Sequence, residues 1–292
     1  MPTYSIKDLY NLTGILPHTI RVWEQRYGLL TPERTPSNFR VYSDKELRKL
    51  LSVALLNRNG LKISKIVQLS DAEIAETVLQ LSEVADSRLE SHIGNLKLIM
   101  VEMDESKFEK WFNHIVLHLG FEEAVLKVFI PFFKRLIYLW QTNSVTVAQV
   151  NFITSLYKQK LYVAIDGLAL SETKNPAKLI LFLPQTENLE HGLLFCNYMA
   201  KKRGFQTLYL GASFPVDELS VICEKNPDSY LISTANLAQI DLTAYYTKVL
   251  ASCSDNGKLL LTGSQIGSVK MNDPRLTVFQ DYVGVKDFLE QL

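Results

Sequence analysis

The sequence predicts a multidomain protein of mixed α and α/β class: a winged helix-turn-helix head, a four-helix bundle, and a doubly wound parallel sheet of the Rossmann type. Three observations lead to this prediction. A short helix and a basic, proline-containing segment fill residues 16–43. Helical periodicity continues from about residue 71 to 170, and after Pro176 apolar strands alternate with helices. The expected domains are residues 1–75, 76–172 and 177–292.

The head begins with two short helices. Ser5 to Asp8 has the form of a capping box, which predicts a helix from Ile6 to about Asn11. Gly14 makes the turn into a second helix, His18 to Arg26, which Gly28 ends. Two helices joined by a short turn that contains glycine are typical of a helix-turn-helix.

A small β-hairpin, or wing, is expected at Asn38 to Tyr42, where apolar and polar residues alternate. Arginines lie on both the second helix and the wing, and guanidinium groups suit bidentate contact with phosphate or guanine. Trp23 is expected in the core and Glu24 beside an arginine. Instead of contacting DNA, Phe39 and Tyr42 could pack the wing onto the rest of the head. The expected DNA-contacting residues are His18, Thr19, Arg21, Arg26, Arg34, Asn38, Phe39, Arg40 and Tyr42.

Charge supports this interpretation of the head. Residues 1–75 carry eleven Lys and Arg against seven Asp and Glu, although the whole chain is neutral. An excess of four positive charges at one end is the asymmetry expected of a nucleic-acid binder with a separate regulatory part.

The middle of the chain is helical. A second capping box, Ser43 to Glu46, starts a helix that continues to about Asn57. Pro131 is expected to kink the helix that contains it, because proline lacks the N–H that the helix needs. Further helices are expected at about 64–69, 71–83, 86–102, 105–119, 121–140 and 146–170.

The last third has the order of a parallel α/β sheet. Strands are expected at 178–183, 206–210, 230–233, 258–262 and 276–279, and helices at 190–203, 215–224, 242–252 and 285–292. Ligands of such sheets bind at the carboxyl ends of the strands. The loops that follow the strands, at 184–192, 211–215, 233–236 and 262–267, are therefore the expected ligand region.

Other classes of site find little support in the sequence. Cys196, Cys223 and Cys253 are scattered without a CxxC motif, which predicts buried thiols in a reducing compartment. His114 and His118 have a helical metal-binding spacing but no evident third ligand, so no metal site is expected. No catalytic constellation, signal-peptide layout or membrane-spanning apolar run is evident. A cytoplasmic protein that is not an enzyme is expected.

Residues 3–70 resemble the DNA-binding domain of the MerR family of transcription regulators. The resemblance implies a homo-oligomer, dimeric or larger, that binds double-stranded DNA at a near-palindromic operator. Leu16 departs from the pattern, since the family often has a Ser or Thr cap there. The matching motifs are Thr13-Gly14, Pro17 to Glu24, Arg26 to Leu29, Pro32, Arg34 and Arg40 to Ser43.

The rest of the chain resembles regulators of the CarH and CarA type, in which a helical bundle and a Rossmann domain hold cobalamin and sense light. Phe132 to Trp140, Leu208 to Gly211 and Pro215 to Leu219 carry this resemblance. It implies a cofactor region formed by Trp140, Asn151, Leu189, Gly192, Ser233 and Gly263.

The position of the cobalt ligand differs from the family. Leu189 stands where the family has a histidine three residues before a glycine, and His191 is adjacent to Gly192 on a different face. Leucine cannot coordinate cobalt, whereas imidazole can. The sequence therefore predicts loss of histidine-ligated cobalamin binding. The open alternatives are cobalamin held base-on or weakly, a different small ligand, a domain kept for oligomer contacts, and a corrinoid carrier for methyl transfer.

Overall fold

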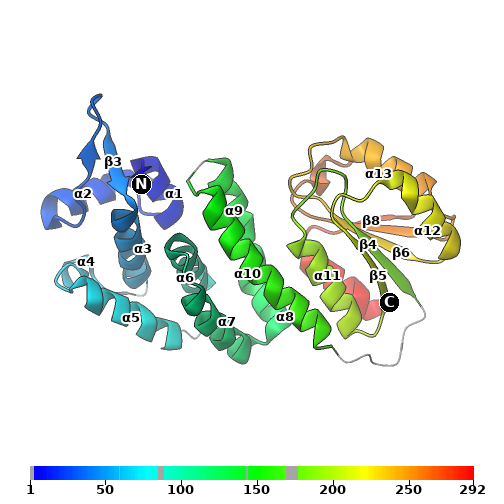
Figure 1. Cartoon of the computed structure of the whole chain (residues 1–292), viewed down its shortest axis with the longest axis horizontal. Coiled ribbons are helices and arrows are strands. Elements are labelled where there is room, and N and C mark those ends of the chain that lie inside the picture. Colours follow the sequence, from blue (N-terminus) through cyan, green and yellow to red (C-terminus); the bar gives the residue numbers. More distant parts are fainter. Residues whose placement is uncertain (1–2, 59, 85–88, 143, 169–176) are drawn as a thin grey trace. The chain divides into compact units, whose positions relative to one another are not determined.

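The computed structural model describes residues 3–58, 60–84, 89–142, 144–168 and 177–292 (Figure 1). The chain forms two compact units, residues 1–156 and 157–292. The helical and α/β fold class predicted from the sequence is confirmed. Among the described residues, no helix combines the length and the apolarity that crossing a bilayer requires.

The first unit begins with five helices and a small antiparallel sheet of strand order β1-β3-β2. Helix α1 ends at Gly14 and α2 ends at Gly28, and both glycines adopt the left-handed conformation. The predicted capping boxes are present, since the Asp8 carboxylate accepts from the Ser5 N–H at 2.8 Å and Glu46 accepts from the Ser43 N–H at 2.7 Å. The elements are β1 (Thr3–Tyr4), α1 (Ile6–Thr13), α2 (Pro17–Tyr27), β2 (Glu33–Arg34), β3 (Arg40–Ser43), α3 (Asp44–Arg58), α4 (Ile63–Ile66) and α5 (Asp71–Val84).

More helices follow, and aromatic side chains fill their core. Trp111 and Phe112 both lie against Phe129, with ring centroids 5.7 and 5.8 Å apart. The helices are α6 (Leu89–Glu102), α7 (Glu105–Leu119), α8 (Phe121–Ala124), α9 (Ile130–Gln141) and α10 (Val147–Asp166).

The kink expected at Pro131 takes another form. A π-helical turn, Val125–Phe129, precedes α9, and the Ile130 N–H donates to the Val125 carbonyl five residues back. The wider turn lets Pro131 lie in the first turn of α9, where its missing N–H costs little. The irregularity therefore precedes the proline instead of breaking the helix at it.

The second unit is a parallel sheet with helices on both faces (Figure 1). Its strand order within the described residues is β5-β4-β6-β7-β8. The expected helix at 215–224 is instead a 3-10 turn, Val216–Glu218, followed by α12. The strands are β4 (Lys178–Phe182), β5 (Gln206–Gly211), β6 (Tyr230–Thr234), β7 (Lys258–Thr262) and β8 (Leu276–Val278), and the helices are α11 (His191–Lys202), α12 (Leu219–Lys225), α13 (Leu242–Ala251) and α14 (Tyr282–Gln291).

The last helix begins three residues earlier than expected. The Asp281 carboxylate accepts hydrogen bonds from the N–H groups of Val283 and Gly284, at 3.0 and 3.1 Å, and so caps α14 ahead of Val285. The earlier start brings Tyr282 into the helix, where its side chain is buried beside α11.

Candidate functional site

One face of α2 is polar and exposed. Its buried face carries Ile20 and Trp23, which lie in the core. His18, Arg21 and Gln25 lie on the exposed side, three and four residues apart. Gln25 was not among the expected contacts, although its helical spacing from His18 and Arg21 was already visible in the sequence. This face has the shape and chemistry that reading of a major groove requires.

The wing is an antiparallel hairpin in which Arg34 lies opposite Arg40. Asn38 turns the chain at its tip with a φ of 64°, a conformation that asparagine tolerates. The Arg34 guanidinium donates to the Asn38 side-chain oxygen at 2.5 Å. Phe39 stands beside this turn with 72% of its surface exposed. The tip therefore carries one cation and one apolar ring into solvent.

Glu24 fastens the wing to α2. Its carboxylate accepts a hydrogen bond from the Tyr42 hydroxyl at 2.5 Å and another from the Arg40 Nε at 3.1 Å. The side chain of Glu24 is 8% exposed, so this ion pair is shielded from solvent. The expected pairing of Glu24 with an arginine thus has Arg40 as its partner. Helix and wing are held as one surface.

Tyr42 is a correction to the expected set of contacts. Its side chain is fully buried, and burial raises the pKa of its hydroxyl. A buried phenol cannot reach a base or a phosphate. Tyr42 positions the wing through Glu24, as its alternative packing role predicted.

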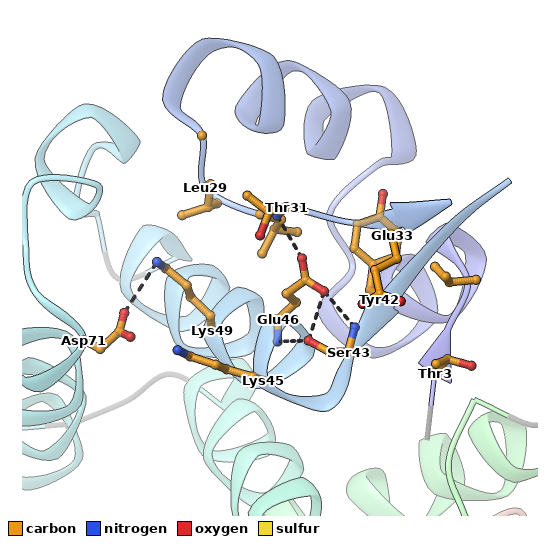
Figure 2. Close-up of a pocket in the computed structure, with 13 residues that line it drawn as sticks. Thr3, Leu29, Thr31, Glu33, Tyr42, Ser43, Lys45, Glu46, Lys49 and Asp71 are labelled. Atoms are coloured by element: carbon orange, nitrogen blue, oxygen red, sulfur yellow. Dashed lines mark hydrogen bonds and ion pairs between the residues drawn. The ribbon is translucent and has the colours of Figure 1, made fainter. Parts of the chain in front are cut away.

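A hollow of about 650 Å³ lies between the wing, α3 and the segment that follows α2 (Figure 2). Glu46 crosses its floor, accepting from the Thr31 N–H at 2.8 Å. Lys45 lies exposed at the rim, and Lys49 lies 3.4 Å from the Asp71 carboxylate. Both lysines join the candidate phosphate contacts. They were missed because the sequence places them on a helix whose relation to the wing is set by tertiary packing.

Helix α1 is joined to the helices behind it by polar contacts at its carboxyl end. The Lys97 ammonium on α6 donates to the Leu12 carbonyl at 2.8 Å, and Arg58 donates to the Thr13 carbonyl. Such cations satisfy the carbonyls that a helix end leaves unpaired. Ser144, after α9, donates to the Asp8 carboxylate at 3.0 Å. These three contacts fix α1 against α3, α6 and the segment that follows α9.

Lys97 makes this joint sensitive to pH. Burial, with smaller contributions from nearby Arg58 and Arg135, lowers the pKa of Lys97 from 10.5 to about 8. A depressed lysine pKa disfavours the folded state while the amine is charged. This penalty is present below the folded pKa and is relieved as pH rises toward the unfolded value.

Lys97→Met is expected to remove this pH dependence. Between pH 7 and pH 10 the free energy of unfolding of the parent protein should rise by about 2 kcal/mol relative to the variant, because only the parent has the amine that loses its proton. Urea unfolding of both proteins across this range measures the difference. Parallel pH profiles would contradict a buried, perturbed lysine.

In the second unit, two loops at the carboxyl edge of the sheet are joined by Glu187. This buried carboxylate accepts from the N–H groups of Asn236 and Leu237, at 2.6 and 2.8 Å. Its other oxygen accepts from the Leu189 N–H at 2.9 Å. The backbone of the expected ligand loop is thus fixed by the chain itself.

Glu190, next along the same loop, is the centre of a second polar cluster. It accepts from the Tyr209 hydroxyl at 3.0 Å and lies 2.6 Å from the Lys158 ammonium. Burial raises the pKa of Glu190, but the hydrogen bonds from Lys158 and Tyr209 outweigh it and lower the pKa overall. The carboxylate therefore stays ionised and holds the loop against residues 157–166 of α10, which belong to the second unit.

Tyr282 fills the space beside Gly192. A Cβ at position 192 would lie 2.0 Å from the Tyr282 hydroxyl oxygen, so the glycine is required by this contact. Gly263 has a φ of 125°, and a Cβ there would lie 2.3 Å from the Ala235 carbonyl oxygen. At both expected cofactor glycines, another residue of the protein comes so close that a side chain at the glycine position would clash with it.

The remaining expected cofactor residues are dispersed. Ser233 shares a hydrogen bond of 3.1 Å with Tyr246 on α13, whereas Gly192 lies on α11, which covers the opposite face of the sheet. Ser233 therefore faces α13, because side chains alternate across a strand and Thr234 takes the α11 side. Its grouping with Gly192 in one cofactor region stays a prediction. Trp140 on α9 and Asn151 on α10 are exposed side chains of the first unit.

Leu189 and its neighbour His191 are both half-buried. Burial lowers the pKa of His191 to about 4, which keeps the imidazole neutral. Its ring stands 6.0 Å from the ring of Tyr157, inside the unit.

Comparison with known proteins connects both regions to families. Residues 4–73 match the family model for MerR HTH family regulatory proteins, and residues 93–165 match the model for the B12 binding domain. The fold is shared by the monomethylamine corrinoid protein of Methanosarcina barkeri, at a TM-score of 0.56 and 13% identity over 70% of this chain and all of that one.

The chain is thus a DNA-binding regulator of the MerR type that also carries a B12-binding-type domain. It is homologous to two HTH-type transcriptional repressors of Myxococcus xanthus, CarH and CarA. Identity to CarH is 25% over 80% of this chain and 79% of the relative, and identity to CarA is 28% over 79% and 76%. The resemblance stated from the sequence is confirmed.

Proposed function

We propose that the chain is a cytoplasmic, non-catalytic transcription regulator that binds a near-palindromic operator as a homo-oligomer. In this proposal residues 1–75 read DNA, residues 76–172 transmit, and residues 177–292 receive a signal other than histidine-ligated cobalamin. The observation that carries the DNA-reading part is Glu24, which holds α2 and the wing together through Arg40 and Tyr42. A helix for the groove and a wing for the backbone are thereby presented as one surface.

The proposal that residues 177–292 receive a signal other than histidine-ligated cobalamin is supported by a poor fit between the second unit and a histidine-ligated corrinoid. Leu189 offers no ligand atom, and the Tyr282 hydroxyl fills the space directly beside Gly192, 2.0 Å from where a Cβ would lie. The half-buried imidazole of His191 lies 6.0 Å from the ring of Tyr157. These contacts support a sheet domain in which the protein's own side chains fill the interior.

The alternatives make different demands on the same residues. Cobalamin held without a histidine would have to displace Tyr282 if it came close to Gly192, because the Tyr282 hydroxyl fills the space there. A corrinoid carrier for methyl transfer would have no use for the exposed arginines of the head. We favour the regulator because α1 connects the head to α6 through Lys97, as a transmitting role requires.

The operator geometry provides the test. Two heads related by a two-fold axis read half-sites spaced by a whole number of DNA turns. Inserting about half a turn, roughly 5 base pairs, between half-sites should abolish cooperative binding, and inserting about one turn, roughly 10 base pairs, should restore much of it. Footprinting on upstream DNA measures how binding depends on half-site spacing, and light scattering measures the mass of the oligomer. Equal affinity for both insertions, or a monomer that binds one half-site, would overturn the proposal.

A further inference from the structure

The structure brings together two cysteines that the sequence separates by thirty residues. Cys223 lies on α12 and Cys253 lies just beyond the end of α13, and their sulfur atoms are 3.5 Å apart. The sequence predicted isolated thiols, because spacing along the chain gives no sign of this approach. Two thiols in van der Waals contact need only a small rotation of their side chains to reach bonding distance.

The three cysteines have different surroundings. Cys196 on α11 is fully buried, and burial raises its thiol pKa to about 12, which makes it unreactive. Cys223 is 2% exposed, but its partner Cys253 is only partly buried and gives small molecules access to the pair. The pair and Cys196 should therefore differ sharply in reactivity.

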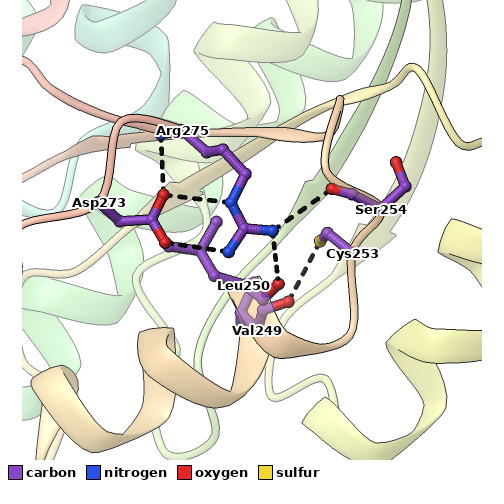
Figure 3. Close-up of polar contacts among 6 residues, drawn as sticks. All are labelled: Val249, Leu250, Cys253, Ser254, Asp273 and Arg275. Carbon is purple, nitrogen blue, oxygen red and sulfur yellow. Dashed lines mark hydrogen bonds and ion pairs between the residues drawn. The ribbon is translucent and has the colours of Figure 1, made fainter.

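Arg275 fixes the segment that carries Cys253 (Figure 3). Its guanidinium pairs with the Asp273 carboxylate at 2.9 Å and donates to the Leu250 carbonyl at 3.1 Å and to the Ser254 carbonyl at 3.4 Å. The Cys253 thiol itself lies 3.1 Å from the Val249 carbonyl. These contacts close the end of α13 and hold the Cys253 sulfur against α12.

Contact between the thiols also affects their ionisation. The hydrogen bond from Cys253 lowers the pKa of Cys223, against an opposing effect of burial. A thiolate, not a thiol, is the nucleophile in cysteine oxidation. One partner of the pair can thus become the reactive species while the other supplies the proton.

We propose that Cys223 and Cys253 form an oxidisable dithiol, a modification site that hydrogen peroxide converts into an intramolecular disulfide. One thiolate attacks a peroxide oxygen, the O–O bond breaks, and a sulfenic acid and hydroxide form. The second sulfur then attacks the sulfenic sulfur, the S–S bond forms, and the sulfenic oxygen leaves as water. The two thiols lose two electrons and two protons, and the peroxide is reduced to two waters.

The disulfide would join α12 to the segment that leads into β7. It would close a loop of thirty residues, which restricts the unfolded chain and stabilises the folded second unit. A thiol reductant would reverse the change. The site is independent of the cobalamin question, since it lies on the face of the sheet that α12 and α13 cover, away from α11.

The test uses the full chain, reduced and then treated with hydrogen peroxide. After denaturation in an alkylating agent, free thiols are counted and disulfide-linked peptides are identified by mass spectrometry. The expected count falls from three to one, with the Cys223 and Cys253 peptides linked within one chain. Thermal unfolding should shift upward by several degrees and return after dithiothreitol treatment.

Three variants sharpen the result. Cys196→Ser should retain the disulfide, whereas Cys253→Ser should lose it and leave both remaining thiols titratable or over-oxidised. Arg275→Met should slow disulfide formation several-fold in protein that remains folded by circular dichroism. A thiol count that stays at three, a linkage that includes Cys196, or cross-links formed only between chains would overturn the proposal.

Discussion

Replacing Arg21 with alanine is expected to weaken operator binding by about 1–3 kcal/mol, a factor of roughly 5 to 150. Arg21 lies on the exposed face of α2, one turn from His18 and from Gln25. A guanidinium at this position can contact guanine in two hydrogen bonds or pair with a phosphate. Removing it deletes that contact and leaves the helix core, formed by Ile20 and Trp23, unchanged.

The dependence of affinity on salt separates the two kinds of contact. If Arg21 binds phosphate, the slope of log affinity against log salt should fall by about one. If it reads a base, the slope should hold while discrimination at one base pair is lost. Fluorescence anisotropy with operator DNA measures both. Lys248→Ala, which removes one exposed positive charge from α13, is the matched control, and equal losses for the two variants would contradict the assignment of α2.

Tyr282→Ala is expected to destabilise the second unit by about 3–5 kcal/mol. The ring is buried between α11 and the sheet, 6.1 Å from the ring of Phe195, and its hydroxyl fills the space that the missing Cβ of Gly192 leaves. Truncation would leave a cavity beside α11, because the helix cannot move far enough to fill it. A loss of this size is a large fraction of a domain's stability.

Tyr282→Phe separates the ring from the hydroxyl. It keeps the packing and should cost only about 1 kcal/mol, since Asn236 and Thr234 beside the hydroxyl lose one polar neighbour. Urea unfolding of the full-chain variants, followed by circular dichroism, compares their stabilities. Equal losses for alanine and phenylalanine would show that the ring does not fill the interior as described.

Local signals explain why so much of the fold could be predicted. Capping boxes at Ser5 and Ser43, left-handed glycines at 14 and 28, and apolar strands bounded by turns each depend on a few neighbouring residues. Strands and helices after Pro176 follow one another with little ambiguity, and the chain order then determines a parallel sheet. Element ends differ from expectation where one side chain decides, as Asp281 does for α14.

The features that could not be predicted all depend on distant contacts. The Cys223–Cys253 pair, the bond from Lys97 to α1 and the filling of Gly192 by Tyr282 join residues 30, 85 and 90 positions apart. Periodicity does not encode such separations. The side of the sheet that Ser233 faces, by contrast, follows from a local signal, the two-residue alternation of side chains along β6.

The fate of cobalamin tests the central claim most directly. Purified protein is incubated with adenosylcobalamin in the dark, passed through a size-exclusion column, and followed at protein and corrinoid absorbance, before and after illumination. Because Leu189 supplies no ligand and Tyr282 fills the space beside Gly192, the corrinoid should elute apart from the protein, and light should change neither the elution volume nor operator affinity. A stoichiometric coloured complex, or a light-dependent change of assembly, would contradict the account.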